Sequence, residues 1–298
     1  MLDRCPGLYC GRIALGNDTW SDCGACPRGF RVNESSACIP CSESPSLYDW
    51  YYLGFMAILP LIMHWFFIDM AAKATSFTKE QIILHTSALL EVSISAVISL
   101  LIAEPMLSFT LHSCGVVRLS DWYTLFHNPS PNYEDTLYCT QEAVYPLQTI
   151  VLIFYLFCLL FMMIIRPPLN KRYMAKGKSA VYCALYFFPV LTVLHAVAGG
   201  LIYYAFPYLS IVISMVSNAC HFSLKLKQTM DVLLKTSITE LKNLVIIAGH
   251  WLLLAYGIIS LRQHLGLLAL VPFPSIFYIL TVHFTDPEEF REREERSN

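Results

Sequence analysis

The sequence predicts an all-α polytopic membrane protein with seven transmembrane helices and a small cysteine-rich segment before the first helix. Two observations predict this fold: apolar windows recur along the 298 residues, and six of the eleven cysteines precede the first window. The composition agrees, because 56% of the residues are hydrophobic and only 14% are charged, which is unlike a soluble domain. A net charge of -2 gives no indication of a nucleic-acid partner.

The first window, residues 47–70, is the clearest of the seven. Residues 51–68 contain no charged side chain, and at ~1.5 Å per residue they extend roughly 27 Å, close to the hydrocarbon thickness of a bilayer. Aromatic residues flank this stretch at 50–52 and 65–67, as is typical of the two membrane interfaces. We therefore expect a helix that spans the membrane, with membrane lipid around it.

Six further windows follow. They lie at about 82–103, 143–165, 181–199, 203–222, 243–260 and 265–284. Residues 181–222 form one apolar run, which we divide at Ala198-Gly199-Gly200 and Pro207 because these residues favour a tight turn. The predicted domains are a cysteine-rich segment (1–48), a seven-helix transmembrane domain (49–284) and a charged tail (285–298).

The basic residues predict the orientation, because lysine and arginine accumulate in cytosolic loops. An N-terminus outside the cytosol places 14 of the 20 basic residues in cytosolic segments. These are Lys73, Lys79, Arg166, Lys171, Arg172, Lys176, Lys178, Lys225, Lys227, Lys235, Lys242, Arg291, Arg293 and Arg296. We therefore expect a lumenal N-terminus and a cytosolic C-terminus.

The N-terminal cysteines are Cys5, Cys10, Cys23, Cys26, Cys38 and Cys41. The last four form two CxxC pairs, which suit a zinc ribbon in the cytosol and disulfides in an oxidising compartment. Asn17 and Asn33 each begin an N-x-S/T sequon, and together with the even cysteine count they favour disulfides and glycosylation. Zinc remains the alternative, and the disulfide pairing stays open.

The long loop after the second window, residues 104–142, contains Cys114 and Cys139. On the lumenal side we expect these two cysteines to pair with each other. The loop centre, SDWYTLFHNPSPNY, is rich in aromatic residues, which predicts an ordered segment that lies at the interface or binds a partner. Cys158, Cys183 and Cys220 lie within windows and are expected to be apolar packing residues.

Three ionisable residues lie in the middle of apolar windows, namely Glu91, His195 and His250. A carboxylate there should face the bundle interior, protonated or paired, and Glu91→Gln is expected to preserve folding and partner binding. No two histidines are four residues apart, so no helix turn offers a pair of metal ligands. We expect buried polar residues that orient helices, with no cofactor and no enzymatic activity.

Two other function classes have to be weighed. An intramembrane enzyme or transporter would use Glu91, His195 and His250. A seven-helix receptor shares the layout, but the chain reads Ile165-Arg166-Pro167-Pro168 after the third window, where G-protein-coupled receptors have an acidic-Arg-aromatic triplet. The receptor therefore rests on layout alone.

Two charged segments lie on the predicted cytosolic side. Residues 223–242 are amphipathic and favour a surface helix with lysines toward anionic lipid. The alternative is a kinase-docking peptide, in which Lys225 and Lys227 precede the hydrophobic anchors Val232 and Leu234. The tail, residues 285–298, is typical of a solvated helix, and its Arg291-Glu292-Arg293 resembles a retrieval motif for the endoplasmic reticulum.

Several strings along the chain occur together in one family. They are GLYCG, CGACPRG, LYDWYYLGFMAILPLIMHWFFID, LSDWYTLFHNPSPNY, CTQEAVYPLQTIV, ALYFFPVLTVLHAVAGGLIYYAFPY, HWLLLAYGIIS and LLALVPFPSIFYILTVHFTDP. On these strings the chain resembles the Jun N-terminal kinase-associated membrane protein (JAMP) family, and the cytosolic loops and tail match least well.

The resemblance implies a multispan protein of the endoplasmic reticulum membrane with a lumenal N-terminus. Members are adaptors that bring proteasome subunits, RING-type ubiquitin ligases and other degradation machinery to misfolded proteins during the unfolded protein response. They also modulate stress signalling by Jun N-terminal kinase. The family has no established catalytic residues, so the resemblance transfers none.

Overall fold

The computed structural model describes residues 4–17, 19–72, 77–129, 137–173, 178–225, 228–263 and 265–285. The chain is mostly helical, which confirms the predicted fold class. The α-helices are α1 (Leu47–Ala72), α2 (Lys79–Ile102), α3 (Leu147–Tyr173), α4 (Lys178–Ser223), α5 (Met230–Thr239), α6 (Leu241–Ser260) and α7 (Phe273–Thr285). Among the described residues, the short 3-10 helices are η1 (Leu119–Trp122), η2 (Thr124–His127) and η4 (Leu265–Leu270).

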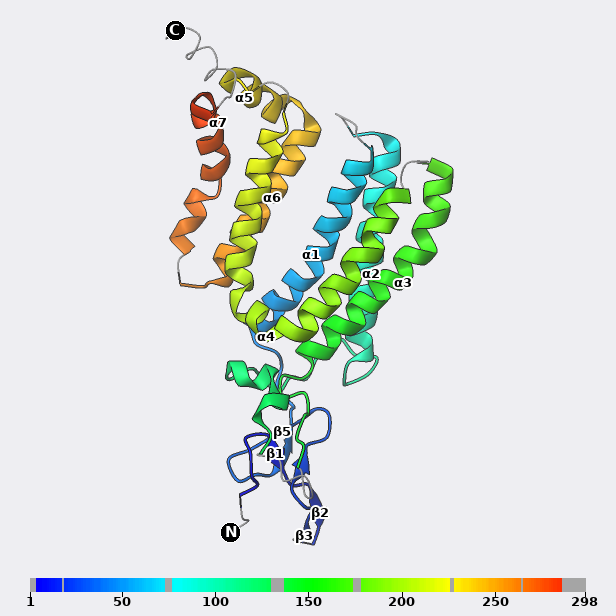
Figure 1. Cartoon of the computed structure of the whole chain (residues 1–298), viewed down its shortest axis with the longest axis vertical. Helices are drawn as coiled ribbons and strands as arrows, with labels where there is room; N and C mark the ends of the chain where they lie inside the picture. The colour runs from blue at the N-terminus through cyan, green and yellow to red at the C-terminus, as the bar shows by residue number, and fades with distance from the viewer. Residues whose placement is uncertain are drawn as a thin grey trace. The chain divides into compact units, whose positions relative to one another are not determined.

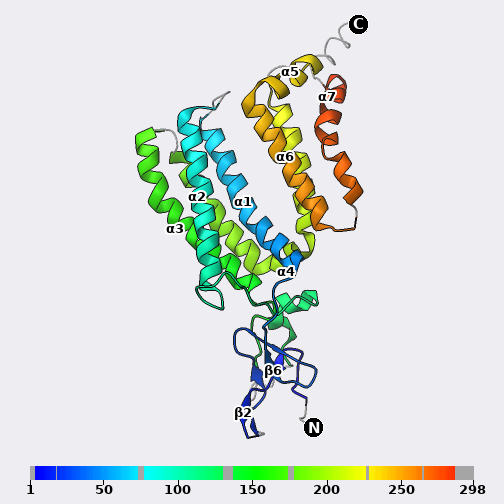
Figure 2. The same ribbon diagram turned by 180° about the vertical axis from the view of Figure 1, so that it is seen from behind.

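The chain divides into two compact units. Unit 1 comprises Met1–Ala72 and Glu80–Tyr204, and unit 2 comprises Lys73–Lys79 and Ala205–Asn298. In unit 1 the helices α1, α2 and α3 lie side by side, and the short strands gather beyond one end of them (Figures 1 and 2). In unit 2 α5 packs across the ends of α6 and α7 (Figure 1).

Among the described residues, six helical segments are long and apolar enough to span a membrane. They are α1, α2, α3, α4, α6 and the stretch from Leu265 to Phe284. The last of these was expected to be one helix, but it consists of η4 followed by α7. The seventh window thus begins as a 3-10 helix, and the α-helical part is shorter than the sequence predicts.

The helix α4 corrects the predicted division at residues 198–200. It is continuous over 46 residues, with no interruption at Gly199 or Gly200. At ~1.5 Å per residue it measures roughly 69 Å along its path, more than twice the hydrocarbon thickness. Its part in unit 1 and its part in unit 2 are each long enough for one crossing, so the chain still contains seven apolar segments.

Gly199 and Gly200 leave a notch in α4 that the side chain of Trp122, from the loop before α3, fills. A Cβ atom on Gly200 would lie 2.7 Å from Trp122 Cβ, and a Cβ atom on Gly199 would lie 3.2 Å from Trp122 Cζ3. The Trp122 ring also packs against Tyr52 and Tyr203, with ring centroids 5.8 and 5.4 Å apart. The glycines are therefore explained by close packing of the indole ring rather than by a turn.

The N-terminal strands and the loop before α3 fold together into one head, which we define as the described residues of 4–46 and 103–146. Its strands form three two-stranded antiparallel sheets. They are β1 (Cys10–Gly11) with β4 (Gly24–Ala25), β2 (Ala14–Gly16) with β3 (Thr19–Trp20), and β5 (Phe30–Val32) with β6 (Cys38–Pro40). These short sheets bury little apolar surface, so the head depends on cross-links.

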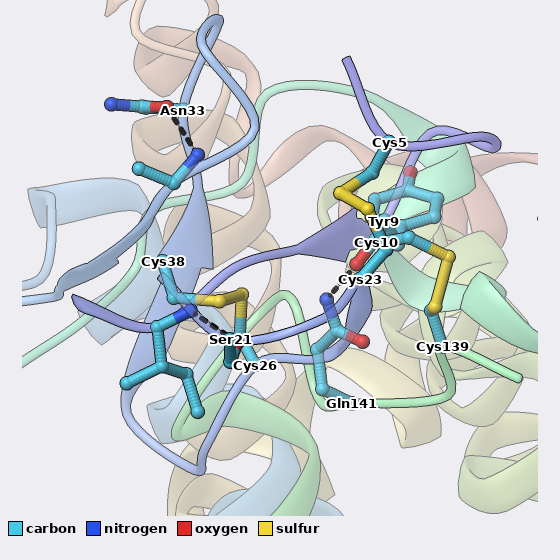
Figure 3. Close-up of a disulfide and its surroundings, with 12 residues drawn as sticks. Cys5, Tyr9, Cys10, Ser21, Cys23, Cys26, Asn33, Cys38, Cys139 and Gln141 are labelled. Atoms are coloured by element: carbon cyan, nitrogen blue, oxygen red, sulfur yellow. Dashed lines mark hydrogen bonds between the residues drawn. A yellow bond between two sulfur atoms is a disulfide. The ribbon is translucent and has the colours of Figure 1, made fainter. Parts of the chain in front are cut away.

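Four disulfides hold the head together, as the predicted disulfide-stapled segment requires. Two lie within the N-terminal segment, Cys5–Cys23 and Cys26–Cys38. The other two join this segment to the loop, Cys10–Cys139 and Cys41–Cys114. Figure 3 shows three of the four bonds.

The expected Cys114–Cys139 pair is therefore wrong, and backbone contacts between segment and loop explain why. The N–H of Ser113 donates to the carbonyl of Glu43 at 2.8 Å, which brings the loop beside Cys41. At the other end, the Gln141 side chain donates to the carbonyl of Tyr9, next to Cys10 (Figure 3). Each loop cysteine thus faces an N-terminal cysteine.

Candidate functional site

A buried ion pair lies among the helices of unit 1. Glu91 on α2 and Arg166 on α3 are joined by two contacts, Nη2 to Oε2 at 3.0 Å and Nε to Oε1 at 3.2 Å. His64 on α1 contacts the same guanidinium, with Nη1 3.0 Å from Nδ1. None of the three residues is more than 1% exposed. The cluster therefore connects α1, α2 and α3 through charged and polar atoms.

The geometry assigns a role to each group. A guanidinium only donates hydrogen bonds, so His64 accepts at Nδ1 and carries its proton on Nε2. The His64 ring is packed against Phe187 and Phe188, with centroids 5.0 and 5.3 Å away. Both oxygens of the Glu91 carboxylate contact Arg166. The charged joint formed by Glu91, Arg166 and His64 therefore holds helices together, and Glu91 is not available as a general acid.

The sequence places Arg166 in a loop with other basic residues, whereas the structure places it inside a helix. The residue lies inside α3, before Pro167, and is buried. A carboxylate in an apolar span needs a cation or a proton, and Arg166 supplies the cation. The sequence contained a signal for this pair. Arg166 directly follows the apolar run FMMII, and Glu91 is a carboxylate in the middle of another apolar window.

The two histidines of the alternative enzyme hypothesis each have other partners. His195 on α4 bonds the carbonyl of Gln148 through Nε2 at 3.1 Å and the Tyr52 hydroxyl through Nδ1 at 3.2 Å. His250 on α6, in unit 2, lies 3.0 Å from the Ser217 hydroxyl through Nδ1. In the described parts of the chain no three His, Cys, Asp or Glu residues are placed to hold a metal ion.

A second charged centre lies in the head, around the buried Asp121 of η1. Its carboxylate accepts hydrogen bonds from Arg31 Nη2 at 3.0 Å and from the Tyr9 hydroxyl at 2.9 Å. The backbone N–H groups of Val117 and Arg118 donate to the same carboxylate. Burial, with Asp121 nearby, raises the pKa of Tyr9 to about 12, so its hydroxyl stays a donor.

Arg31 also ties the loop to the N-terminal segment. Its Nη1 donates to the carbonyls of Cys114 and Gly115 at 3.2 and 2.8 Å. Asp121 thus holds the N-terminal segment through Arg31, and the neighbouring Trp122 fills the notch at Gly199 and Gly200 of α4. Together they connect the head to the helices of unit 1. The sequence indicated an ordered loop here, but neither residue had been singled out.

The two sequons lie in turns of the head. The Asn33 side-chain oxygen accepts from the Ser35 N–H, the Ser35 hydroxyl and the Ala37 N–H. In Figure 3 the Asn33 nitrogen points away from this turn. Asn17 follows β2 with a φ of 48°, a left-handed conformation that asparagine tolerates well. The next residue of that sequon, at position 18, lies outside the described residues.

The kinase-docking candidates fall around α5. The ammonium group of Lys225 donates a hydrogen bond to Asn243 Oδ1. Partial burial lowers the pKa of this lysine. Lys227 lies outside the described residues. Val232 and Leu234 are both in the helix, where residues two apart point in different directions, so they do not form one row of anchors.

The outer face of α5 presents a different set. Exposed apolar residues recur at helical spacing along α5 and just after its end. On the opposite side of the helix, Leu233 is buried against residues of α4, α6 and α7 in unit 2. The outer set is Met230, Leu234, Ile238 and Leu241. The predicted amphipathic segment is thus a short helix with an apolar outer stripe.

The remaining predicted positions are the three cysteines within the apolar windows and the charged tail. Cys158 is buried and Cys183 is half-buried, whereas Cys220 is exposed and so is not a packing residue. The charged tail, 285–298, is described only at its first residue, and Arg291-Glu292-Arg293 lies outside the described part.

The comparisons with known proteins cover almost the whole chain. A family model described as JNK1/MAPK8-associated membrane protein matches residues 5–287. The JNK1/MAPK8-associated membrane proteins of Homo sapiens and Mus musculus are 50% and 48% identical over 300 residues, each covering 95% of this chain and 94% of the relative. A homolog of that protein from Caenorhabditis elegans is 32% identical over 282 residues, with 92% and 86% covered. No solved structure matches significantly.

Proposed function

Because the chain belongs to the JNK1/MAPK8-associated membrane protein family, we propose that it is a non-enzymatic adaptor of the endoplasmic reticulum membrane. In this function it binds Jun N-terminal kinase and recruits proteasome subunits and RING-type ubiquitin ligases for the degradation of misfolded proteins. The observation that carries the proposal is the match over residues 5–287 to a family named for its kinase association.

The head supports a lumenal N-terminus. Four disulfides suit an oxidising compartment such as the lumen of the endoplasmic reticulum. Two spanning helices, α1 and α2, separate Cys41 from Cys114, so a chain that crosses twice returns to the side on which it began. Both sequons belong to this head, and glycosylation there also requires the lumenal side.

The outer stripe of α5 supports a cytosolic contact surface. Met230, Leu234 and Ile238 on α5 and Leu241 just after it are exposed and apolar. With Lys225, Lys235 and Lys242 nearby in the sequence, the stripe offers a partner both apolar and positively charged contacts. A single helix face of this size binds weakly, so recruitment relies on several loops or several copies acting together.

One experiment tests the kinase contact and its mode. Leu234→Ser and Ile238→Ser are matched variants, since both residues are exposed on the same face of α5 and only Leu234 belongs to the linear motif. Recovery of Jun N-terminal kinase with the full-length protein is measured in mild detergent. If α5 binds as a helix, both variants reduce recovery; if α5 unwinds into a linear peptide, only Leu234→Ser does. Unchanged recovery for both would remove α5 from the proposal.

A second experiment tests compartment and orientation. Asn17→Gly and Ser35→Ala each remove one sequon, and both are compatible with the local turns, because glycine accepts a positive φ and Asn33 keeps two backbone donors. A glycan that is lost in these variants and cleaved by endoglycosidase H supports residence in the endoplasmic reticulum with a lumenal head. A resistant glycan would place the protein beyond this compartment, and no glycan would leave the lumenal head without this support.

A further inference from the structure

An apolar groove lies in unit 1 between the 3-10 helices of the head and α4. One wall consists of Leu119, Tyr123 and Phe126, and the other of Val197 and Leu201. Ser120 and His127 complete the lining, and the cavity measures about 530 Å³. The groove is open, and the side chains that face it are mainly apolar.

The α4 wall is part of a longer apolar surface. Exposed residues recur every three or four positions along the helix and so share one face. They are Tyr186, Val190, Val193, Val197 and Leu201. Because α4 is a candidate span, this face meets lipid, and the groove continues it at the end nearest the head.

The opposite wall is held in place by the contacts already described. Trp122, which ends η1, fills the notch at Gly199 and Gly200, one helical turn from Val197. Asp121 fixes the same 3-10 helix to Arg31. Yet Phe126 is 79% exposed and the preceding Leu125 is 60% exposed, although neither belongs to a span. The 3-10 helices therefore present apolar side chains beside a lipid-facing helix from a rigid position.

We propose that this groove binds one acyl chain of a glycerophospholipid from the leaflet on the head's side. Lipid is the occupant because the α4 wall is continuous with the surface that the bilayer covers. Ser120, Tyr123 and His127 are the polar residues of the lining, but nearly all of the surface that faces the groove is apolar, as an acyl chain requires.

The test uses the full-length protein in nanodiscs of phosphatidylcholine that includes a diazirine-labelled acyl chain. Photo-crosslinked peptides are identified by mass spectrometry. We expect lipid adducts on residues 119–127, outside any span, and a several-fold reduction by Leu201→Trp, which fills the groove. Val193→Trp is the matched control, because it lies on the same exposed face of α4 outside the groove lining.

Two outcomes overturn the proposal: no adduct on residues 119–127 in the wild type, or the same yield in Leu201→Trp as in Val193→Trp. Phe126→Ser provides a second variant on the other wall in case the tryptophan disturbs folding, and it should lower the yield in the same way. Adducts to another polypeptide in cells, without a lipid adduct in nanodiscs, would assign the groove to a protein partner and also refute the lipid.

Discussion

The two units differ in the kind of polar group that they bury. Unit 1 buries ionised or ionisable side chains, including Asp49, Glu91, Asp121 and Arg166. In the described part of unit 2, the buried polar residues are all neutral. These are Ser210, Ser214, Asn218, Ser237, Asn243, Ser260 and Ser275.

The neutral groups of unit 2 bond mostly to nearby carbonyls and to one another. Ser210 donates to the carbonyl of Leu253, and Ser214 to that of His250, at 2.8 and 2.6 Å. Such bonds between membrane helices contribute about 0.6 kcal/mol on average, whereas removing one partner of a buried ion pair costs about 3–5 kcal/mol. The comparison teaches that unit 1 specifies one arrangement strictly, while unit 2 tolerates single losses.

The largest effect should come from breaking the charged joint. Glu91→Gln leaves the Arg166 guanidinium buried without its counter-charge, and we expect a loss of about 3–5 kcal/mol in stability. The structure thus reverses the expectation from the sequence that this substitution preserves folding. Denaturation of the purified protein in mixed micelles measures the change.

The double variant Glu91→Gln with Arg166→Met is the control for this prediction. It removes both charges, so it should be more stable than Glu91→Gln alone. A Glu91→Gln protein as stable as the wild type would show that the pair does not hold the helices together.

A smaller effect is expected at the notch of α4. Gly200→Ala places a methyl group 2.7 Å from Trp122 Cβ, which should lower the stability of unit 1 by about 1–3 kcal/mol. Gly249→Ala, in α6 of unit 2, is the matched control, because nothing lies within 4 Å of a Cβ there. It should be neutral or raise stability by up to about 1 kcal/mol through helix propensity. Equal effects in both variants would argue against the notch.

The next effect concerns the second charged centre of unit 1 and depends on pH. The pKa of Tyr9 is raised to about 12 from an ordinary value of 10.0, so the folded head favours the protonated hydroxyl. Its contribution to stability is complete below pH 10 and is lost as the pH rises from 10 to 12. Urea unfolding at several pH values measures this loss, and Tyr9→Phe should lack that part of the pH dependence. A wild-type curve that matches the variant throughout would refute the prediction.

The smallest effect belongs to unit 2. Ser214→Ala removes one neutral hydrogen bond to the carbonyl of His250, and we expect a loss of about 0.6 kcal/mol. The same denaturation assay applies. A loss as large as that of Glu91→Gln would erase the contrast between the two units.

The sequence predicted the helices well because spanning segments leave a strong trace in composition. An unbroken apolar run such as residues 51–68 has few alternatives to a membrane helix. The same pattern identified Glu91 as unusual, since an ionisable group in such a run needs a partner. The partner was missed because Arg166 follows the apolar run, where basic residues normally lie outside the membrane.

Tertiary contacts explain the remaining differences. Gly199 and Gly200 fit a turn as well as a close contact, and only the position of Trp122 distinguishes the two. The pairing of Cys41 with Cys114 depends on how the loop docks on the N-terminal segment, which no local pattern encodes. The sequence alone did not show which side of α5 is exposed, because this follows from the burial of Leu233 against unit 2.

The disulfides that join the two parts of the head also impose an order on biosynthesis. Cys41 and Cys114 are 73 residues apart, and Cys10 and Cys139 are 129 apart, with α1 and α2 between the members of each pair. At about 5–20 residues per second, a ribosome needs roughly 4–15 s to make the shorter interval. Until then the partner of Cys41 has not been synthesised, so the two disulfides that join the segment to the loop form only after α1 and α2 have been made, whereas Cys5–Cys23 and Cys26–Cys38 need only the N-terminal segment.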